Sequence, residues 1–204
     1  MGPDHPLTGQ LMRFLKNWLA LIVHRAYEHA ERKLRNEWEQ MEKEKFASCG
    51  PGVHLNGRSK FSGHDHINIG ANVHIGNNAH IRGEGGLYIG DNTHISRNLV
   101  LYTVNHNFEG ESLPSDAELI MKEVYIGKNV AIGMNVCITP GTTIDDGAVI
   151  GMGAIVSGHV PKLAYAVGYK QKVIKYRDVE HYNKLEELGK YSGKGCISLE
   201  KFSQ

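Results

Sequence analysis

The sequence is poor in cysteine and in net charge, and it has no long apolar run. Its 204 residues include three cysteines, Cys49, Cys137 and Cys196, which are widely spaced and form no C-x-x-C pair. We therefore expect no disulfide framework and no paired-cysteine zinc site, but reduced thiols in a cytoplasmic protein. The formal net charge of +1 provides no broadly basic surface, so we expect no nucleic-acid partner. The apolar run at residues 18–23 is too short to span a bilayer.

Residues 7–47 are predicted to form one long helix or two short ones. Leu11, Leu15 and Trp18 recur at helical spacing, and from Glu28 onward acidic and basic residues are interspersed, as on a solvated helix. The Gly-Pro-Gly sequence at residues 50–52 ends the segment. We expect the apolar face to pack on the next domain or on a partner subunit. Peripheral contact with the inner face of a membrane is the alternative.

A period of six residues dominates the middle of the chain. Aliphatic residues occupy every sixth position from 126 to 156, namely Ile126, Ile132, Ile138, Ile144, Ile150 and Val156. Neither a helix nor an alternating strand has this period. It is typical of a chain wound into coils, in which every sixth side chain faces a shared interior.

A longer period gives the size of the coils. Leu55, Ile75 and Ile95 are twenty residues apart, whereas the later hexads give coils of eighteen. We expect the two extra residues at one corner, where residues 65–66 and 85–86 fall. The glycines that follow the inward aliphatic residues, such as Gly76, are expected to supply unusual dihedral angles at the corners. We divide the chain into a helical segment (1–50), a coiled domain (51–163) with an inserted loop (102–125), and a C-terminal part (164–204). The C-terminal part is expected to contain an extended strand to residue 177, a short helix over 178–190 and a tail.

Repeats such as Ile69-Gly-Ala-Asn-Val-His and Ile126-Gly-Lys-Asn-Val-Ala match the hexapeptide signature of a known family. Over about residues 53–177 the chain resembles the left-handed parallel β-helix acyltransferases, in the galactoside and maltose acetyltransferase branch that includes enzymes that O-acetylate bacterial surface polysaccharides. The resemblance implies a mainly β fold, a left-handed parallel β-helix, and acetyl-CoA as co-substrate without a metal. It also implies a homotrimer, with coenzyme and saccharide acceptor bound between neighbouring coil stacks.

The inserted loop carries the candidate catalytic residue. The loop is too long for a corner, and His106 lies near its start, five residues after Leu101. A sugar hydroxyl is too weak an acid to attack a thioester unaided near neutral pH, whereas a neutral imidazole can take its proton. We predict that His106 is the general base, and His106 also matches the catalytic histidine of the family. Tyr102, Asn105 and Asn77 are the predicted acceptor contacts.

The resemblance also implies how coenzyme A is bound. The backbone N–H of Met134 matches the family's donor to the developing oxyanion. A cluster of cations after Gly168, which includes Lys170, suits the phosphates of the coenzyme, although a solvated basic strand has the same composition. The predicted coenzyme contacts are Met134, Met152, Ser157, Gly168, Lys172, Lys175 and Arg177.

The chain departs from the family pattern at four places. The family often has serine at the oxyanion donor, which is Met134 here, and a backbone donor survives this change; the next two departures bear on the acceptor. A common tryptophan is Ala131 here, and an acceptor-contacting asparagine aligns with Gly76. The usual turn before the basic segment is replaced by residues 169–171, Tyr-Lys-Gln.

We therefore predict transfer of an acetyl group to a saccharide hydroxyl, and N-acetylation of an amino sugar is the alternative. A zinc hydro-lyase of the γ-carbonic anhydrase type shares the coiled architecture but places two ligands five residues apart, whereas His74 and His80 are six apart. An inactive scaffold is the third possibility. His54, His74 and His94 are expected to stack on successive coils, as a polar outer face or, alternatively, as a metal ladder.

Overall fold

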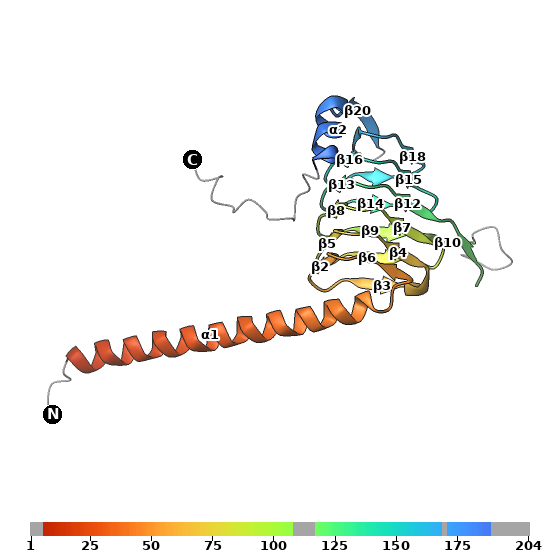
Figure 1. Ribbon diagram of the computed structural model, residues 1–204. Helices are drawn as coiled ribbons and strands as arrows, with labels where there is room; N and C mark the ends of the chain where they lie inside the picture. Colours follow the sequence, from red (N-terminus) through yellow and green to blue (C-terminus); the bar gives the residue numbers. More distant parts are fainter. Residues whose placement is uncertain (1–5, 108–116, 169–170, 189–204) are drawn as a thin grey trace. The chain divides into compact units, whose positions relative to one another are not determined.

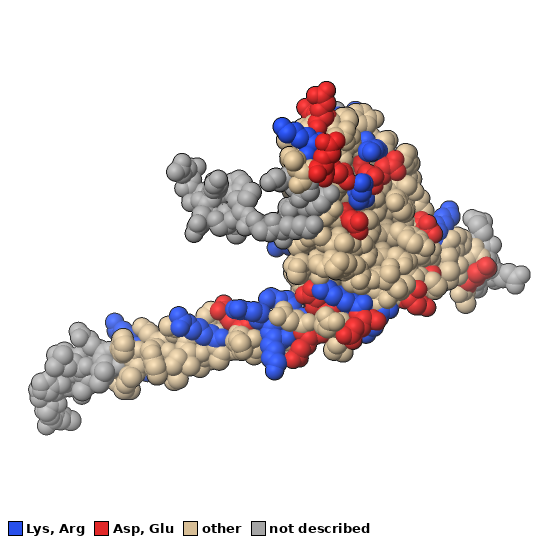
Figure 2. Space-filling view, in the orientation of Figure 1, with Lys and Arg blue, Asp and Glu red and all other residues tan. Residues whose placement is uncertain are grey.

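The computed structural model describes residues 6–107, 117–168 and 171–188 and divides into two compact units, Met1–Gln40 and Met41–Gln204. The predicted N-terminal helix is one helix, α1 (Pro6–Lys43) (Figure 1). In Figure 2 its C-terminal half mixes acidic and basic side chains, whereas the described part of its N-terminal half shows only basic and uncharged ones. No described helix has both the length and the apolar character needed to cross a membrane.

The second unit is a parallel β-solenoid of about six turns, built from three parallel sheets (Figure 1). Sheet A contains, in order, β1 (Ser48–Cys49), β4 (Ile67–Ile69), β7 (Leu87–Ile89), β12 (Val124–Ile126), β15 (Thr143–Ile144) and β18 (His159–Val160). Sheet B contains β2 (His54–Asn56), β5 (His74–Gly76), β8 (His94–Ile95), β13 (Ala131–Ile132), β16 (Val149–Ile150), β19 (Ala164–Val167) and β20 (Lys172–Tyr176). Sheet C contains β3 (Lys60–Ser62), β6 (His80–Arg82), β9 (Val100–Tyr102), β14 (Cys137–Ile138) and β17 (Ile155–Val156). The predicted fold class is confirmed.

The register of the sheets confirms the two coil lengths. His54 pairs with His74 and His74 with His94, twenty residues apart, whereas Ala131 pairs with Val149 after eighteen. The two extra residues lie between sheets C and A, because the buried Ile81 and Ile89 are eight residues apart. In the first coil this corner holds a short 3-10 helix, η1 (His64–His66). The inserted loop leaves the solenoid at the same corner one coil after Ile81, and its described part forms an antiparallel hairpin of β10 (Val104–His106) and β11 (Leu119–Met121).

The hexad residues form the core of the solenoid. All six aliphatic residues from Ile126 to Val156 are at most 2% exposed. The fully buried Thr93 shows how a polar group is accommodated there: its Oγ1 donates to the Gly127 carbonyl at 2.8 Å and accepts from the Val130 N–H at 3.1 Å. Both hydrogen-bonding directions of the hydroxyl are therefore used, which offsets the loss of water on burial.

The prediction for the glycines was wrong about their role. None of the glycines that follow the inward aliphatic residues has a positive φ. The left-handed conformation lies two residues later at the corners, with φ between 54° and 61° at six asparagines (Asn72, Asn78, Asn92, Asn98, Asn129 and Asn135) and with φ of 69° and 73° at Gly147 and Gly153 in the later coils. A Cβ atom on Gly90 would lie 2.6 Å from both the Gly127 carbonyl carbon and the Lys128 nitrogen of the next coil. Glycine is therefore required because the next coil passes too close for a side chain.

The two ends of the solenoid are closed in different ways. Near β1, the buried Glu42 carboxylate accepts hydrogen bonds from Lys45 Nζ at 2.7 Å and His64 Nε2 at 2.9 Å. Burial by itself would raise the pKa of Glu42, but these two hydrogen bonds outweigh it and hold the pKa below its ordinary value.

At the other end, the strand predicted over residues 164–177 is two strands, because β20 turns back antiparallel to β19. The predicted short helix is α2 (Val179–Glu187), whose N-terminus is capped by Asp178. The Glu186 side chain accepts hydrogen bonds from Lys128 Nζ at 2.5 Å and Asn129 Nδ2 at 3.0 Å, which attaches α2 to the solenoid. The predicted tail lies outside the described residues.

We expect Gly90→Ala to lower the free energy of unfolding by about 1–3 kcal/mol, because the new methyl group has to displace the backbone of the next coil. Asn92→Gly is the matched variant two residues away, because glycine tolerates the φ of 56° found there. Urea denaturation of the two variants should show the larger loss for Gly90→Ala. Equal losses would contradict the conclusion that position 90 has no room for a side chain, whereas position 92 requires only a positive φ.

Candidate active site

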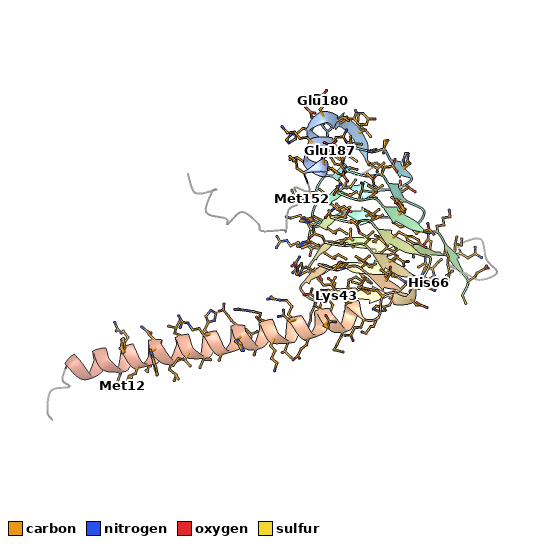
Figure 3. All side chains as sticks on the ribbon, in the orientation of Figure 1. Met12, Lys43, His66, Met152, Glu180 and Glu187 are labelled. Atoms are coloured by element: carbon orange, nitrogen blue, oxygen red, sulfur yellow. The ribbon has the colours of Figure 1, made fainter. Side chains whose placement is uncertain are left out.

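The turns that lead from sheet B into sheet C stack into one edge, here called the BC edge. One residue from each of five coils occupies the same position there, and these residues are Asn77, Arg97, Met134, Met152 and Gly168. Their carbonyls join the coils: Asn98 N–H donates to Asn77 at 3.0 Å, Asn135 to Arg97 at 3.2 Å and Gly153 to Met134 at 2.9 Å. Three predicted coenzyme contacts and one predicted acceptor contact thus share one edge. Met152 is 67% exposed on it (Figure 3).

The opposite ends of the sheet C strands form a second edge, the CA edge, where the chain continues into sheet A. Arg82 and Tyr102 pair there, and Thr139 N–H donates to the Val156 carbonyl at 3.0 Å, which brings Thr139 level with Ser157. The β10–β11 hairpin leaves from this edge. The predicted residues Tyr102, Asn105, His106 and Ser157 therefore lie at the CA edge.

His106 is the last residue of β10 and is exposed. It pairs with Leu119, while Asn105 pairs with Ile120. Because successive side chains of a strand point to opposite faces, the His106 imidazole and the Asn105 amide lie on different faces of the hairpin. The His106 backbone N–H donates to Asn105 Oδ1 at 3.0 Å, so the two residues are still coupled.

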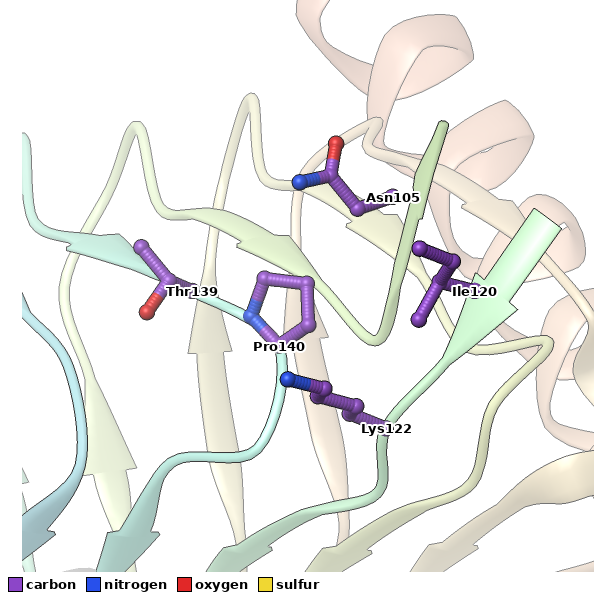
Figure 4. A pocket seen from close by; sticks show the side chains of 5 residues that line it. All are labelled: Asn105, Ile120, Lys122, Thr139 and Pro140. Carbon is purple, nitrogen blue, oxygen red and sulfur yellow. The ribbon is translucent and has the colours of Figure 1, made fainter. Parts of the chain in front are cut away.

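A pocket of about 220 Å³ lies beside the hairpin (Figure 4). Its lining residues are Asn105, Ile120, Lys122, Thr139 and Pro140. An amide, an ammonium group and a hydroxyl are thus set between two apolar walls, a composition suited to a polar ligand such as a sugar. His106 is not one of the lining residues. Asn105 was predicted from the sequence, but Lys122 was not. The only feature of the sequence that could have indicated Lys122 is its position near the end of the insertion.

Tyr102 contributes a ring to the CA edge. Its centroid lies 5.6 Å from that of His80 in an edge-to-face arrangement, and the Arg82 guanidinium lies 5.6 Å from it on one side. Arg82 also pairs with Glu84 at 3.3 Å. These contacts hold the Tyr102 ring in one orientation at the outer side of sheet C.

Those predicted cations that the structure describes do not form one cluster. Lys172 pairs with Val167, next to Gly168 on the BC edge. Lys175 Nζ lies 4.4 Å from the Tyr165 ring centroid, in the middle of sheet B. The Arg177 guanidinium lies 5.8 Å from the Tyr182 ring, at the far end of that sheet. Lys170 lies outside the described residues.

Gln171 ties the turn after β19 to the CA edge. The Ser157 N–H donates to Gln171 Oε1 at 3.2 Å, and Gln171 Nε2 donates back to the Ser157 carbonyl. Both backbone groups of the predicted coenzyme contact Ser157 are therefore used within the chain, which leaves its hydroxyl as the group for a ligand.

His106 and Met134 are not brought together within one chain. Met134 precedes β14 at the BC edge, whereas His106 projects from the CA edge, so the width of sheet C separates them. The N–H of Met134 donates to no group within the described part of the chain, whereas those of its neighbours Gly133 and Asn135 donate to adjacent coils. A free backbone donor is the group that the predicted oxyanion role requires.

The three histidines stack as predicted on the outer side of sheet B. Ring centroids are 5.0 Å apart for His54 and His74 and 4.4 Å apart for His74 and His94. Among the described residues, no group of three His, Cys, Asp or Glu side chains has the arrangement of a metal site.

Comparisons with known proteins place the chain in a family. The model "Bacterial transferase hexapeptide (six repeats)" matches residues 123–158, and "Hexapeptide repeat of succinyl-transferase" matches residues 66–103. A galactoside acetyltransferase solved in complex with coenzyme A is 32% identical, with a TM-score of 0.60, and the match covers 71% of this chain and 72% of that one. The chain belongs to the hexapeptide-repeat acyltransferase family.

Two further structures share the fold of this hexapeptide-repeat acyltransferase. An acetyltransferase from Vibrio cholerae O1 biovar eltor, complexed with acetyl coenzyme A, is 24% identical with a TM-score of 0.63, covering 70% of this chain and 78% of that one. AntD, an N-acyltransferase from Bacillus cereus in complex with dTDP and 3-hydroxybutyryl-CoA, is 22% identical with a TM-score of 0.60, covering 75% and 95%. No curated protein matches the sequence.

Proposed function

We propose that this acyltransferase moves the acetyl group of acetyl-CoA to a hydroxyl of a saccharide, with His106 as general base. The observation that carries the proposal is the arrangement around sheet C. One edge has an exposed imidazole on a hairpin, and the other has the free backbone donor of Met134 together with two further predicted coenzyme positions, Met152 and Gly168. Coenzyme A in the galactoside acetyltransferase structure, at 32% identity, supports the choice of donor.

The reaction follows from these groups. One ring nitrogen of neutral His106 accepts the hydroxyl proton while the oxygen attacks the thioester carbonyl carbon. The carbonyl oxygen becomes negative and accepts a hydrogen bond from the Met134 N–H, which is fixed by the coil stack and needs no reorganisation. When the tetrahedral intermediate collapses, the carbon–sulfur bond breaks and the imidazolium returns its proton to the thiolate. The products are the acetyl ester and coenzyme A.

This chemistry needs two copies of the chain, because His106 and Met134 lie on different edges. A cyclic assembly in which the BC edge of one copy meets the hairpin of the next completes every site at once. We therefore propose a homotrimer, with the coenzyme between neighbouring solenoids. An amino sugar is the alternative acceptor, and the fold shared with the N-acyltransferase AntD is compatible with it. A neutral amine is already nucleophilic and depends less on a base.

Replacement of the base tests the mechanism. His106→Ala should lower kcat/KM for O-acetylation by about 10²–10⁴-fold, because the hydroxyl loses its proton acceptor. Thiol release from acetyl-CoA in the presence of a sugar panel, with mass spectrometry of the products, measures the effect.

His66→Ala is the matched control, because His66 is also exposed and lies at the CA corner of the first coil. Both variants should keep the wild-type mass in light scattering, about three times 22.7 kDa. Near wild-type O-acetylation by His106→Ala would refute the assignment of His106 as the base. A large loss of kcat/KM with hydroxyl acceptors, without a similar loss with amino sugars, would show that only O-acetylation depends on His106.

The spread of the predicted cations gives a second test. Lys172→Ala should raise the Kd for coenzyme A about three- to tenfold, because Lys172 lies beside the BC edge and a charge-assisted contact to a phosphate is lost. Arg177→Ala should change it little, because that guanidinium is held over Tyr182. Isothermal titration calorimetry with coenzyme A measures both, and equal weakening by the two variants would argue against the BC edge as the coenzyme site.

The N-terminal half of α1 has the composition of a helix that lies on an anionic membrane surface. Met12 is 57% exposed, Phe14 65% and Trp18 55%, and no acidic residue occurs between Pro6 and Tyr27. The exposed charges on this part are Arg13, Lys16 and Arg25. Exposed aromatic and aliphatic side chains together with cations, and without carboxylates, are typical of helices that bind an anionic bilayer surface. We propose that the enzyme binds the surface of anionic bilayers through this segment.

Vesicle co-sedimentation of the full chain tests this contact. Binding should be stronger to vesicles that contain phosphatidylglycerol than to phosphatidylcholine alone, and Trp18→Gln should weaken it several-fold because a buried indole is lost. Leu34→Gln, in the half of α1 that mixes both charges, should leave binding unchanged. Equal sedimentation with both kinds of vesicle, or equal effects of the two substitutions, would contradict the proposal.

A further inference from the structure

The outer side of sheet C and the BC edge carry charges of one sign. Within the described residues, the outward positions of β3, β6, β9, β14 and β17 and the turns of the BC edge contain no Asp or Glu. The cationic side chains in the same region are Arg58, Lys60, Arg82 and Arg97. The acidic residues of the solenoid turns, such as Glu84 and Asp146, lie at the other two edges. A ligand that lies along sheet C therefore meets a positive surface.

Arg97 is a cation of the BC edge beside the proposed oxyanion donor. Along the BC edge its neighbours are Asn77 in the coil before and Met134 in the coil after. A Cβ atom on Gly76 would lie only 2.4 Å from the Arg97 nitrogen, so the backbone of Arg97 packs directly against Gly76 of the coil before. Adjacent coils are about 4.8 Å apart, so Arg97 lies within the breadth of a sugar ring of the Met134 N–H.

The Arg97 guanidinium is exposed, and no carboxylate of the described residues pairs with it. No ion pair or side-chain hydrogen bond involves it among the described residues, whereas the neighbouring Arg82 pairs with Glu84 at 3.3 Å. Lys122, in the pocket beside Asn105, likewise has no carboxylate partner in the described part of the chain. Two unpaired cations thus lie at the two edges that the proposed assembly brings together.

We propose that Arg97 binds a negatively charged group of the acceptor, so that the enzyme acetylates an acidic saccharide. This inference rests on the proposed function and specifies its substrate class. A guanidinium binds a carboxylate or a phosphate through two parallel hydrogen bonds, which also orients the sugar. The charge has two candidate sources with this shared chemistry, which are the carboxylate of a sugar acid and the diphosphate of a nucleotide sugar.

Acetyl transfer to three acceptors tests the inference. Glucuronic acid, UDP-glucose and neutral glucose are compared with acetyl-CoA as donor. The wild type should prefer at least one charged acceptor, and the preferred one identifies the source of the charge. Arg97→Gln should lower kcat/KM for that acceptor by about ten- to a hundredfold, mostly through KM, because a charge-assisted contact is lost. Arg97→Lys should restore part of the loss, and transfer to glucose should be unchanged.

Arg58→Gln is the matched control, since Arg58 is also an exposed arginine of the BC edge but lies two coils from Arg97. It should leave all three activities unchanged. If Arg97→Gln changes kcat/KM for charged and neutral acceptors by the same factor, the inference is overturned while the proposed function stands. If the wild type prefers neither charged acceptor over glucose, the inference is likewise overturned while the proposed function stands.

Discussion

The close stacking of successive coils is the constraint on which the rest of this structure depends. Main-chain hydrogen bonds join each coil to the next, and the distance between them leaves no room for a Cβ atom at positions such as Gly90 and Gly133. The interior is then filled by two buried side chains from most sides of the coils, as with Leu99 and Leu101. Because spacing and register are fixed by the backbone, the side chains at the corners have little freedom in where they appear.

This constraint explains how a repetitive fold carries a specific site. Each edge presents one position per coil, so residues eighteen to twenty positions apart in the sequence become neighbours, as Met134 and Met152 do. Chemistry enters where the repeat is broken, and the hairpin that carries His106 leaves from the one corner that already has two extra residues. The solenoid thus provides rigid positions, and the insertion provides the group that the repeat lacks.

Much of the fold could be predicted from the hexad of aliphatic residues, because a period of six has few structural solutions. The coil lengths and the corner with the extra residues followed from the same count. The role of the glycines could not be predicted in this way, because close approach of the backbone and unusual dihedral angles both select glycine. Only the structure shows that Asn92 has a positive φ. The handedness came from the family resemblance, and the turn that splits residues 164–177 into two strands had Gly168 as its only signal.

The candidate site was predicted as a set of residues but not as an arrangement. His106 and Met134 were both named, yet their separation by the width of sheet C depends on which corner each occupies, and spacing alone does not give this. Arg177 was grouped with Lys172 because they are close in sequence, although β20 carries them to opposite ends of sheet B. Lys122 was missed because a single lysine after an apolar strand is a common surface residue.

The reversal of β20 has a consequence for the length of the stack. A parallel solenoid leaves unpaired backbone groups on its terminal coils, and these invite another chain to continue the array. Since β20 runs against β19, an incoming coil would meet a strand of the wrong direction, and α2 is attached beside it through Lys128 and Asn129. The direction of this one strand, together with α2, therefore opposes growth of sheet B into a fibre at this end.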